Sequence, residues 1–278
     1  MAVTIQSIKA LQERTGAGIM DCKKALVEAD GDEEKAIDIL REKGIAKAAA
    51  KAGRTAAEGV ASIGLSADKK TAVVVEINCE TDFVSASPKF HEIVDKIVAR
   101  LIEKQPADLE GAQKATEDIF TDAVVAMREN FVFRRYLILH ADGDEAFGKY
   151  IHAGGKIAAL VEISKDMGEE INKGLAMTVA SSSPEFLTLA DVPAEAKARE
   201  LAIAEKEVAE DPKLQSKPDQ VKATIAQRKV DSRLGDACLG SKAYALDMTG
   251  KLSVDQLAKE KGFKVINFVR YEVGQLSK

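Results

Sequence analysis

The stretch that decides the fold is residues 78–88, which read NCETDFVSASP. The run before it, residues 72–77, reads AVVVEI; it is short, β-branched and bounded by polar residues, which predicts a buried strand. Behind it, Ser87 suits an N-cap, and Pro88 gives up no hydrogen bond at the first helical position. The apolar residues that follow recur at helical spacing and are Phe90, Ile93, Val94, Ile97, Val98, Leu101 and Ile102. The stretch is therefore predicted to join a strand to a helix.

The predicted loop between this strand and this helix carries a carboxylate, Asp82, next to a phenyl ring, Phe83. An aromatic side chain on a short loop held by rigid elements suits an interface anchor, because it buries a large apolar area at little entropic cost. The alternative is that Phe83 folds back into the core of its own domain, as large apolar side chains commonly do. The stretch alone leaves both interpretations open.

Length and composition predict a soluble globular protein. A chain of 278 residues fits one large domain or two to three small ones. Its 46% hydrophobic and 31% charged residues are ordinary, and 5% aromatic residues without Trp indicate aliphatic, Ala-rich helices. The 40 Lys and Arg against 45 Asp and Glu give a net charge of −5, which offers no electrostatic footprint for nucleic acid or an anionic membrane. Charge therefore favours a protein or a small molecule as the partner.

The start of the chain, its apolar runs and its cysteines indicate the cell compartment. The start of the chain lacks a basic segment followed by an apolar one, and no apolar run approaches the length of a membrane span. The cysteines Cys22, Cys79 and Cys238 are odd in number and widely separated, which argues against a disulfide framework. These features predict a cytoplasmic protein without a membrane anchor.

Residues 1–54 are predicted to form a module of three short helices and a linker. Breaks at 15–18 and 29–31 separate the helices, and Asp32 is expected to cap the third. The tail, residues 46–54, is helical by propensity but has no apolar stripe, which indicates the linker. The apolar positions expected inside the helices are Ile5, Ile8, Leu11, Cys22, Ala25, Leu26, Ala36, Ile37 and Leu40.

The turn that opens the second helix of this module carries Ile19 and Met20. One interpretation is an exposed, soft apolar contact for a docking partner. The other is that Ile19 and Met20 close the core of the module itself.

Two related α+β subdomains are predicted after the module, formed by residues 55–140 and by residues 141–191 with 234–278. The first is expected to hold strands at 59–65 and 71–78 and helices at 88–103 and 114–129. The second is expected to hold strands at 150–152, 156–164 and 264–273 and helices at 168–181 and 253–260. VEIN at 75–78 and VEIS at 161–164 take the same place in the two patterns, which favours related units with small antiparallel sheets.

Residues 192–233 are predicted to form an inserted antiparallel helical hairpin. The segment is rich in Ala, Glu and Lys, with Leu201, Ala204 and Val208 on one side of its first helix and Val221 and Ile225 on its second. Such a pair of helices hides its seam only partly. Self-association into a homodimer through this arm is one interpretation, and a solvated surface insertion is the other.

The sequence lacks the motifs of common enzyme classes. Residues 155–156 and 250–251 both read Gly-Lys, but without the upstream glycine and the following hydroxyl of a phosphate loop. GAGIMD at 16–21 follows a predicted helix rather than a strand, so it does not fit a dinucleotide fingerprint. HEIVD at 91–95 has a carboxylate where a metalloprotease helix has its second imidazole. No catalytic residue, no metal and no cofactor are therefore predicted.

Two other classes of function stay open from the residues alone. A non-catalytic adaptor would use the amino-terminal module and the helical arm to bind partners without any effect on a nucleotide. An enzyme would use Cys79 beside His91, although no third group that orients them is evident.

Four stretches, in order along nearly the whole chain, resemble the bacterial elongation factor Ts family. They read RTGAGIMDCKKAL at 14–26, NCETDFV at 78–84, YIHAGGK at 150–156 and FVRYEVG at 268–274. Members of this family are guanine nucleotide exchange factors of the GTPase elongation factor Tu. The resemblance implies a ubiquitin-associated-like amino-terminal module, two related core subdomains, and a hairpin that supports dimerisation in some members.

The same resemblance implies a contact loop formed by Thr81, Asp82, Phe83 and Val84. In the family, the residues matching Asp82 and Phe83 insert between two helices of the GTPase domain and displace its bound magnesium ion. This chain is thus expected to bind elongation factor Tu in its GDP form and to promote exchange of GDP for GTP.

Two further contacts follow from the resemblance. The amino-terminal module, around Ile19 and Met20, is expected to touch the GTPase domain elsewhere, and the third motif places His152 close to it. Enterobacterial members continue for a further helix that docks on the GTPase, whereas this sequence stops at residue 278, so that contact is expected to be missing.

Overall fold

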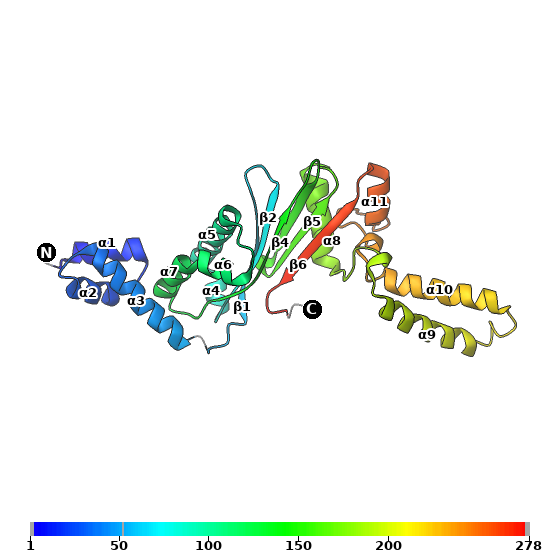
Figure 1. Ribbon diagram of the computed structural model, residues 1–278, viewed down its shortest axis with the longest axis horizontal. Coiled ribbons are helices and arrows are strands. Elements are labelled where there is room, and N and C mark those ends of the chain that lie inside the picture. The colour runs from blue at the N-terminus through cyan, green and yellow to red at the C-terminus, as the bar shows by residue number, and fades with distance from the viewer. Residues whose placement is uncertain (1–2, 52, 276–278) are drawn as a thin grey trace. The chain divides into compact units, whose positions relative to one another are not determined.

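The computed structural model describes residues 3–51 and 53–275, without the side chains of residues 45 and 47–51. It is a mixture of helices and two small antiparallel three-stranded sheets (Figure 1). The predicted α+β class, with a helical N-terminal region, is confirmed. Contacts divide the chain into two units. The first contains the described residues of Met1–His140, Ile151–Ala158 and Tyr271–Lys278, and the second contains Ala141–Tyr150 and Ala159–Arg270.

Three helices open the first unit, as predicted: α1 (Ile5–Thr15), α2 (Ile19–Glu28) and α3 (Glu33–Lys51). Gly16 ends α1 in the left-handed conformation with φ 67°, which a glycine adopts without steric cost. Asp32 accepts a hydrogen bond from the Lys35 N–H at 3.1 Å, so the predicted cap is present. The core of the module is formed by Leu11, Ala17, Cys22, Ala25, Leu26, Ala29, Ala36 and Leu40.

Two details of this module bear on the predicted helices and linker. Ile5 begins α1, as its place in the pattern predicts, but its side chain is exposed. The tail at 46–54 is helical up to Lys51, where α3 ends, in agreement with its predicted helical propensity; residue 52 lies outside the described residues. Its role as a linker stays a prediction.

The first sheet has the order β1–β2–β3, with antiparallel β1 (Glu58–Leu65), β2 (Thr71–Cys79) and β3 (Val132–His140). Every residue of the central strand β2 is buried, as its β-branched run predicts. Alternate β2 residues enter one core cluster with the buried face of α5 (Pro88–Lys104). Ser87 caps α5 by accepting a hydrogen bond from the Phe90 N–H at 3.3 Å, and Pro88 stands at its first position, as predicted.

From the end of β2 to β3 the structure differs from the predicted elements in several places. The predicted helix at 114–129 corresponds to α7 (Glu117–Met127), and a separate helix before it, α6 (Leu109–Ala115), was not predicted. Thr116 separates them with φ −119° and ψ 8°, and its buried hydroxyl donates to the Ala112 carbonyl at 2.8 Å. Strand β3 had no counterpart among the predictions. The predicted loop after β2 is a short helix, α4 (Asp82–Ser85).

The second sheet has the order β4–β5–β6, with β4 (Ala146–His152), β5 (Ile157–Ile163) and β6 (Val265–Glu272). All three strands were predicted. The similar tetrapeptides VEIN and VEIS both lie at the end of a central strand, the first in β2 and the second in β5. The helices and short 3₁₀ turns that accompany this sheet are η1 (Ala153–Gly155), α8 (Glu169–Ser182), η2 (Leu189–Asp191), η3 (Leu239–Ser241) and α11 (Val254–Lys261).

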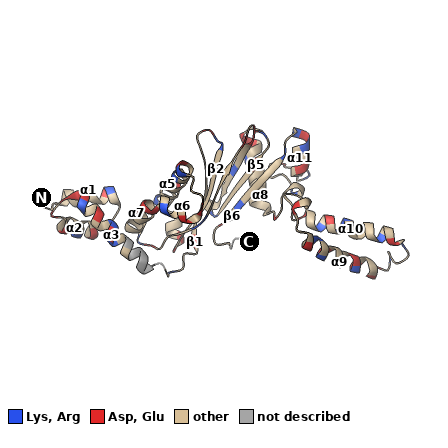
Figure 2. Cartoon of the chain, viewed as in Figure 1, with Lys and Arg blue, Asp and Glu red and all other residues tan. Residues whose placement is uncertain are grey.

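Helices α9 (Ala194–Glu210) and α10 (Asp219–Gly235) pack along each other in the second unit. Their seam is filled by Ala204, Val208, Ala226 and Val230, so the two helices cover one another's apolar side. Basic and acidic residues alternate over the outside of both (Figure 2), and Glu207 pairs with Lys229 at 3.0 Å and with Arg233 at 2.7 Å. Self-association through this hairpin stays a prediction, as does the division of the chain into residues 1–54, 55–140, 141–191 with 234–278, and 192–233.

Candidate functional site

The segment that links β2 to α5 is one helical turn that is fixed at both ends. Thr81 is the N-cap of α4, and its hydroxyl oxygen accepts a hydrogen bond from the Val84 N–H at 3.4 Å. At the other end the Ser87 hydroxyl donates to the Val84 carbonyl at 2.8 Å and also caps α5. The Ser85 hydroxyl donates to the Asp82 carbonyl at 3.1 Å. The turn is therefore held by the strand before it and by the helix after it.

This turn presents Asp82 and Phe83 to solvent. Val84 packs against the core cluster of the first sheet and Ser85 is buried, so these two residues anchor the turn. Phe83 is 85% exposed and Asp82 is exposed beside it. The interpretation that Phe83 folds back into its own core is therefore wrong.

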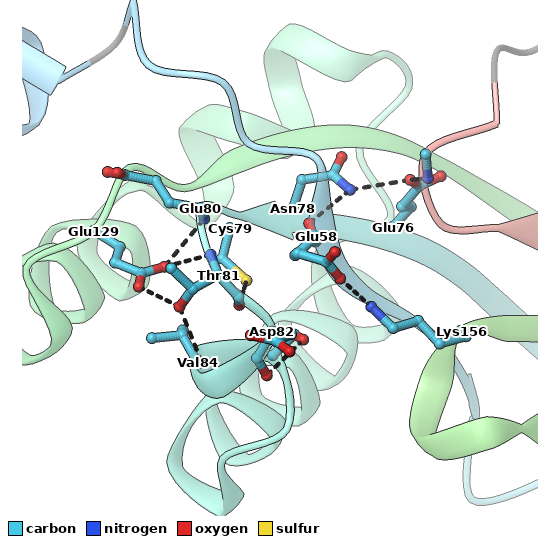
Figure 3. Close-up of polar contacts among 12 residues, drawn as sticks. Glu58, Glu76, Asn78, Cys79, Glu80, Thr81, Asp82, Val84, Glu129 and Lys156 are labelled. Carbon is cyan, nitrogen blue, oxygen red and sulfur yellow. Dashed lines mark hydrogen bonds and ion pairs between the residues drawn. The ribbon is translucent and has the colours of Figure 1, made fainter.

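A carboxylate that the sequence analysis did not single out holds the start of the turn. Glu129, between α7 and β3, accepts hydrogen bonds from the Glu80 N–H at 3.0 Å and from the Thr81 N–H at 3.2 Å (Figure 3). Its other oxygen accepts from the Thr81 hydroxyl at 2.6 Å. No sequence signal points to Glu129, because the contact joins residues that are 48 and 49 positions apart.

The residues next to Glu129 extend this contact. The Asn130 N–H donates to the Glu80 carboxylate at 2.7 Å, and the Asn130 side chain donates to the Arg54 carbonyl at 3.0 Å. Arg128 adopts φ 60° and pairs with Asp21 of α2 at 2.8 Å. One corner of the fold thus carries hydrogen bonds to the turn, to the segment before β1 and to the amino-terminal helices.

The other predicted contact residues lie on other elements. Ile19 and Met20, the first residues of α2, are 56% and 61% exposed, so the interpretation that they close the module's core is wrong. His152 is exposed at the end of β4. Four residues later Lys156 pairs with Glu58 of β1. Thr81, Asp82, Phe83 and Val84 therefore come together in one turn, while Ile19 with Met20 and His152 form separate exposed positions.

Cys79 has the opposite of the environment that a nucleophile needs. It is fully buried at the end of β2, and its thiol donates to the Thr81 carbonyl at 3.3 Å. Burial, and then the negative charge of Glu129, raise the pKa of the thiol to about 12. A thiol that stays protonated is inert, which opposes an enzyme built on Cys79 beside His91.

The turn does not line the main groove of the first unit. This groove, of about 550 Å³, lies along β3 and residues 105–109, and no residue of α4 is in its lining. Within residues 3–51 and 53–275, no three His, Cys, Asp or Glu side chains gather as a metal-binding group. None of the helices in these ranges combines the length and the apolar character needed to cross a bilayer. An exposed aromatic side chain on a fixed turn is an arrangement suited to contact with another macromolecule.

Comparison with known proteins gives a consistent match. Residues 80–275 match the family model described as "Elongation factor TS". Elongation factor Ts of Levilactobacillus brevis is 38% identical over 280 residues, which cover 98% of this chain and 92% of that protein. Elongation factor Ts of Trichlorobacter lovleyi is 37% identical over 296 residues, which cover 99% of this chain and 94% of that protein.

Proposed function

This chain belongs to the elongation factor Ts family of translation elongation factors, and we propose that it promotes the exchange of GDP for GTP on elongation factor Tu. It binds the GTPase in its GDP form, in the cytoplasm, and needs no contact with nucleic acid or a membrane. It makes and breaks no covalent bond.

The exchange step that we propose is performed by Asp82 and Phe83. They enter between two helices of the GTPase domain and displace the magnesium ion that the partner holds. That ion bridges the nucleotide phosphates and the GTPase loops and is the largest local charge there, so shifting its supports weakens nucleotide binding strongly. The observation that carries this proposal is the exposure of Phe83 on a turn that is capped and anchored.

A fixed backbone favours the insertion of Phe83 between the helices of the partner. An exposed phenyl ring gains apolar contact area when a partner covers it, and it loses little conformational freedom if its backbone is already fixed. Thr81 and Val84, at the two ends of the turn, supply that fixing through the cap and the core contact.

Thermodynamic linkage explains how the factor and the nucleotide displace one another from the GTPase. A factor that binds the nucleotide-free GTPase more tightly than the loaded one must weaken nucleotide binding by the same ratio. GTP or GDP therefore expels the factor in turn. The excess of GTP over GDP in the cell makes the net exchange run from GDP to GTP.

Three further residues hold the partner without acting on the nucleotide. Ile19 and Met20 offer an exposed apolar contact at the start of α2, and His152 offers an exposed contact at the end of β4. These positions contribute affinity, whereas the turn contributes the exchange.

Release of a fluorescent GDP analogue from elongation factor Tu tests the function. The factor is expected to accelerate release with saturation, whereas an adaptor would bind without acceleration and would contradict the proposal. The magnesium step has a separate test in EDTA, where the partner's metal is already removed. The acceleration is expected to shrink there, and an undiminished acceleration would contradict magnesium displacement while leaving exchange activity in place.

A further inference from the structure

We propose that Glu129 is the positioning residue of the exchange turn, because it fixes the capping hydroxyl of Thr81 and thereby the direction in which Asp82 and Phe83 point. The functional part of this inference rests on the exchange function proposed above. The structural part, that Glu129 orders the turn, is independent of it.

Three donors converge on the Glu129 carboxylate. The N–H groups of Glu80 and Thr81 reach one oxygen at 3.0 and 3.2 Å, and the Thr81 hydroxyl reaches the other at 2.6 Å. An ionised carboxylate only accepts hydrogen bonds and has room for all three. The hydroxyl contact has the length typical of a charge-assisted O–H···O⁻ bond.

The hydroxyl of Thr81 does two things at once. Its hydrogen is committed to Glu129, so its lone pairs are left to accept from the Val84 N–H at 3.4 Å. Without Glu129, the Thr81 hydroxyl would be free to rotate, and its lone pairs would no longer be directed at the Val84 N–H. Helix α4 has four residues, too few to form without a cap and tertiary contacts. Glu129 therefore supports the turn through Thr81.

The contact is reciprocal, which favours a positioning role. Glu80, just before the cap, accepts from the Asn130 N–H at 2.7 Å, next to Glu129. Two carboxylates from two separate segments thus each bind the backbone of the other segment. The raised pKa of Cys79, to which the charge of Glu129 contributes, agrees with this close approach.

A set of Glu129 variants separates positioning from general stability. In Glu129→Ala, the amides of Glu80 and Thr81 are expected to exchange hydrogen faster, while the midpoint of global unfolding changes little. The maximal rate of stimulated GDP release is expected to fall about tenfold, as for loss of a helix cap, with a change of less than about threefold in the factor concentration for half-maximal rate. The factor concentration for half-maximal rate is expected to change little because Ile19, Met20 and His152 are unchanged.

Graded and coupled variants sharpen the test. Glu129→Gln keeps one acceptor oxygen and is expected to lie between wild type and Glu129→Ala, and it also serves if the alanine variant fails to fold. Thr81→Val added to Glu129→Ala is expected to cost little more, because both remove the same cap. Glu92→Gln, an exposed carboxylate of α5, is the matched control and is expected to change neither amide exchange nor GDP release.

Two results would overturn the proposal: unchanged protection of the Glu80 and Thr81 amides in Glu129→Ala, or fast amide exchange together with wild-type GDP release. Phe83→Ala, by comparison, is expected to lose GDP release without changing the amides of Glu80 and Thr81. If the wild-type factor fails to accelerate release at all, the exchange function is wrong, and amide exchange still decides whether Glu129 orders the turn.

Discussion

The guanidinium of Arg135 donates a hydrogen bond at 2.7 Å to the carboxylate of Glu76, which is fully buried in the middle of the first sheet. The pair lies opposite in register at the β-bulge between β2 and β3. Glu76 also accepts from the Asn78 side chain at 3.1 Å and from the Gly274 N–H at 3.0 Å, and Arg135 lies 4.1 Å from the ring centre of Tyr271. The buried charge is therefore paired and its oxygens are satisfied.

Removal of Arg135 is expected to be strongly destabilising. Arg135→Ala leaves the Glu76 carboxylate buried without its cation, which costs about 3–5 kcal/mol of unfolding free energy for a pair of this kind. Urea unfolding measures the loss. Arg14→Ala is the control, because Arg14 pairs with Glu33 and Glu34 at the exposed surface, where such pairs contribute little. Equal losses in the two variants would show that the buried pair has no special weight.

Glu162, near the end of β5, is expected to weaken the fold as the pH rises. Burial, and then the charges of Glu145 and Asp142, raise the pKa of its carboxyl above the ordinary 4.5. An acid whose pKa is higher in the folded state stabilises the fold fully below its unfolded pKa. This contribution to the unfolding free energy is lost as the pH rises through the folded pKa. Glu162→Gln is therefore expected to be more stable than wild type at about pH 7, and the gain is expected to vanish near pH 4.

Urea unfolding of both proteins at the two pH values checks this difference. Glu260→Gln, at an exposed position of α11, is the control and is expected to show no such gain. A Glu162→Gln variant that is less stable than wild type at neutral pH would contradict the sign of the pKa shift.

Ile19 and Met20 are expected to set affinity and not the exchange step. Burial of a side chain as large as Met contributes enough that Met20→Ala should raise the half-maximal factor concentration about tenfold or more. The maximal rate of GDP release should stay near that of wild type, since the turn at Phe83 is unchanged. Titration of the factor in the release assay gives both quantities. Ile5→Ala, another exposed aliphatic of the same module, is the control, and an equal effect of that variant would argue against a specific contact.

Elements with local signals were predictable from the sequence. The run at 72–77 and the Ser87-Pro88 start each carry their structure in neighbouring residues, and β2 and α5 formed where these patterns placed them. The similar tetrapeptides VEIN and VEIS likewise lie in two predicted strands, which are the central strands β2 and β5 of the two sheets. Hydrophobic periodicity, caps and breaks act within one or two turns, so a single sequence suffices to find them.

The rest depended on contacts between distant residues. Strand β3 reads VFRRYLILH, and its bulge beside Glu76 interrupts the alternation by which strands are identified. The break at Thr116 comes from a side chain that competes for the helix backbone. The exposure of Phe83 and the contacts of Glu129 follow from how β2, α4 and the segment after α7 meet, which no local pattern encodes.

GDP release from elongation factor Tu with the Phe83→Ala variant decides whether this side chain performs the exchange. Because Phe83 is 85% exposed, its removal should change the unfolding free energy by no more than about 0.5 kcal/mol. The maximal stimulated rate should fall at least about thirtyfold, as for an interface hot spot. Met248→Ala, at a 98% exposed position of the second unit, should leave both quantities unchanged. A Phe83→Ala variant that stimulates release as fast as wild type would contradict the proposed exchange mechanism.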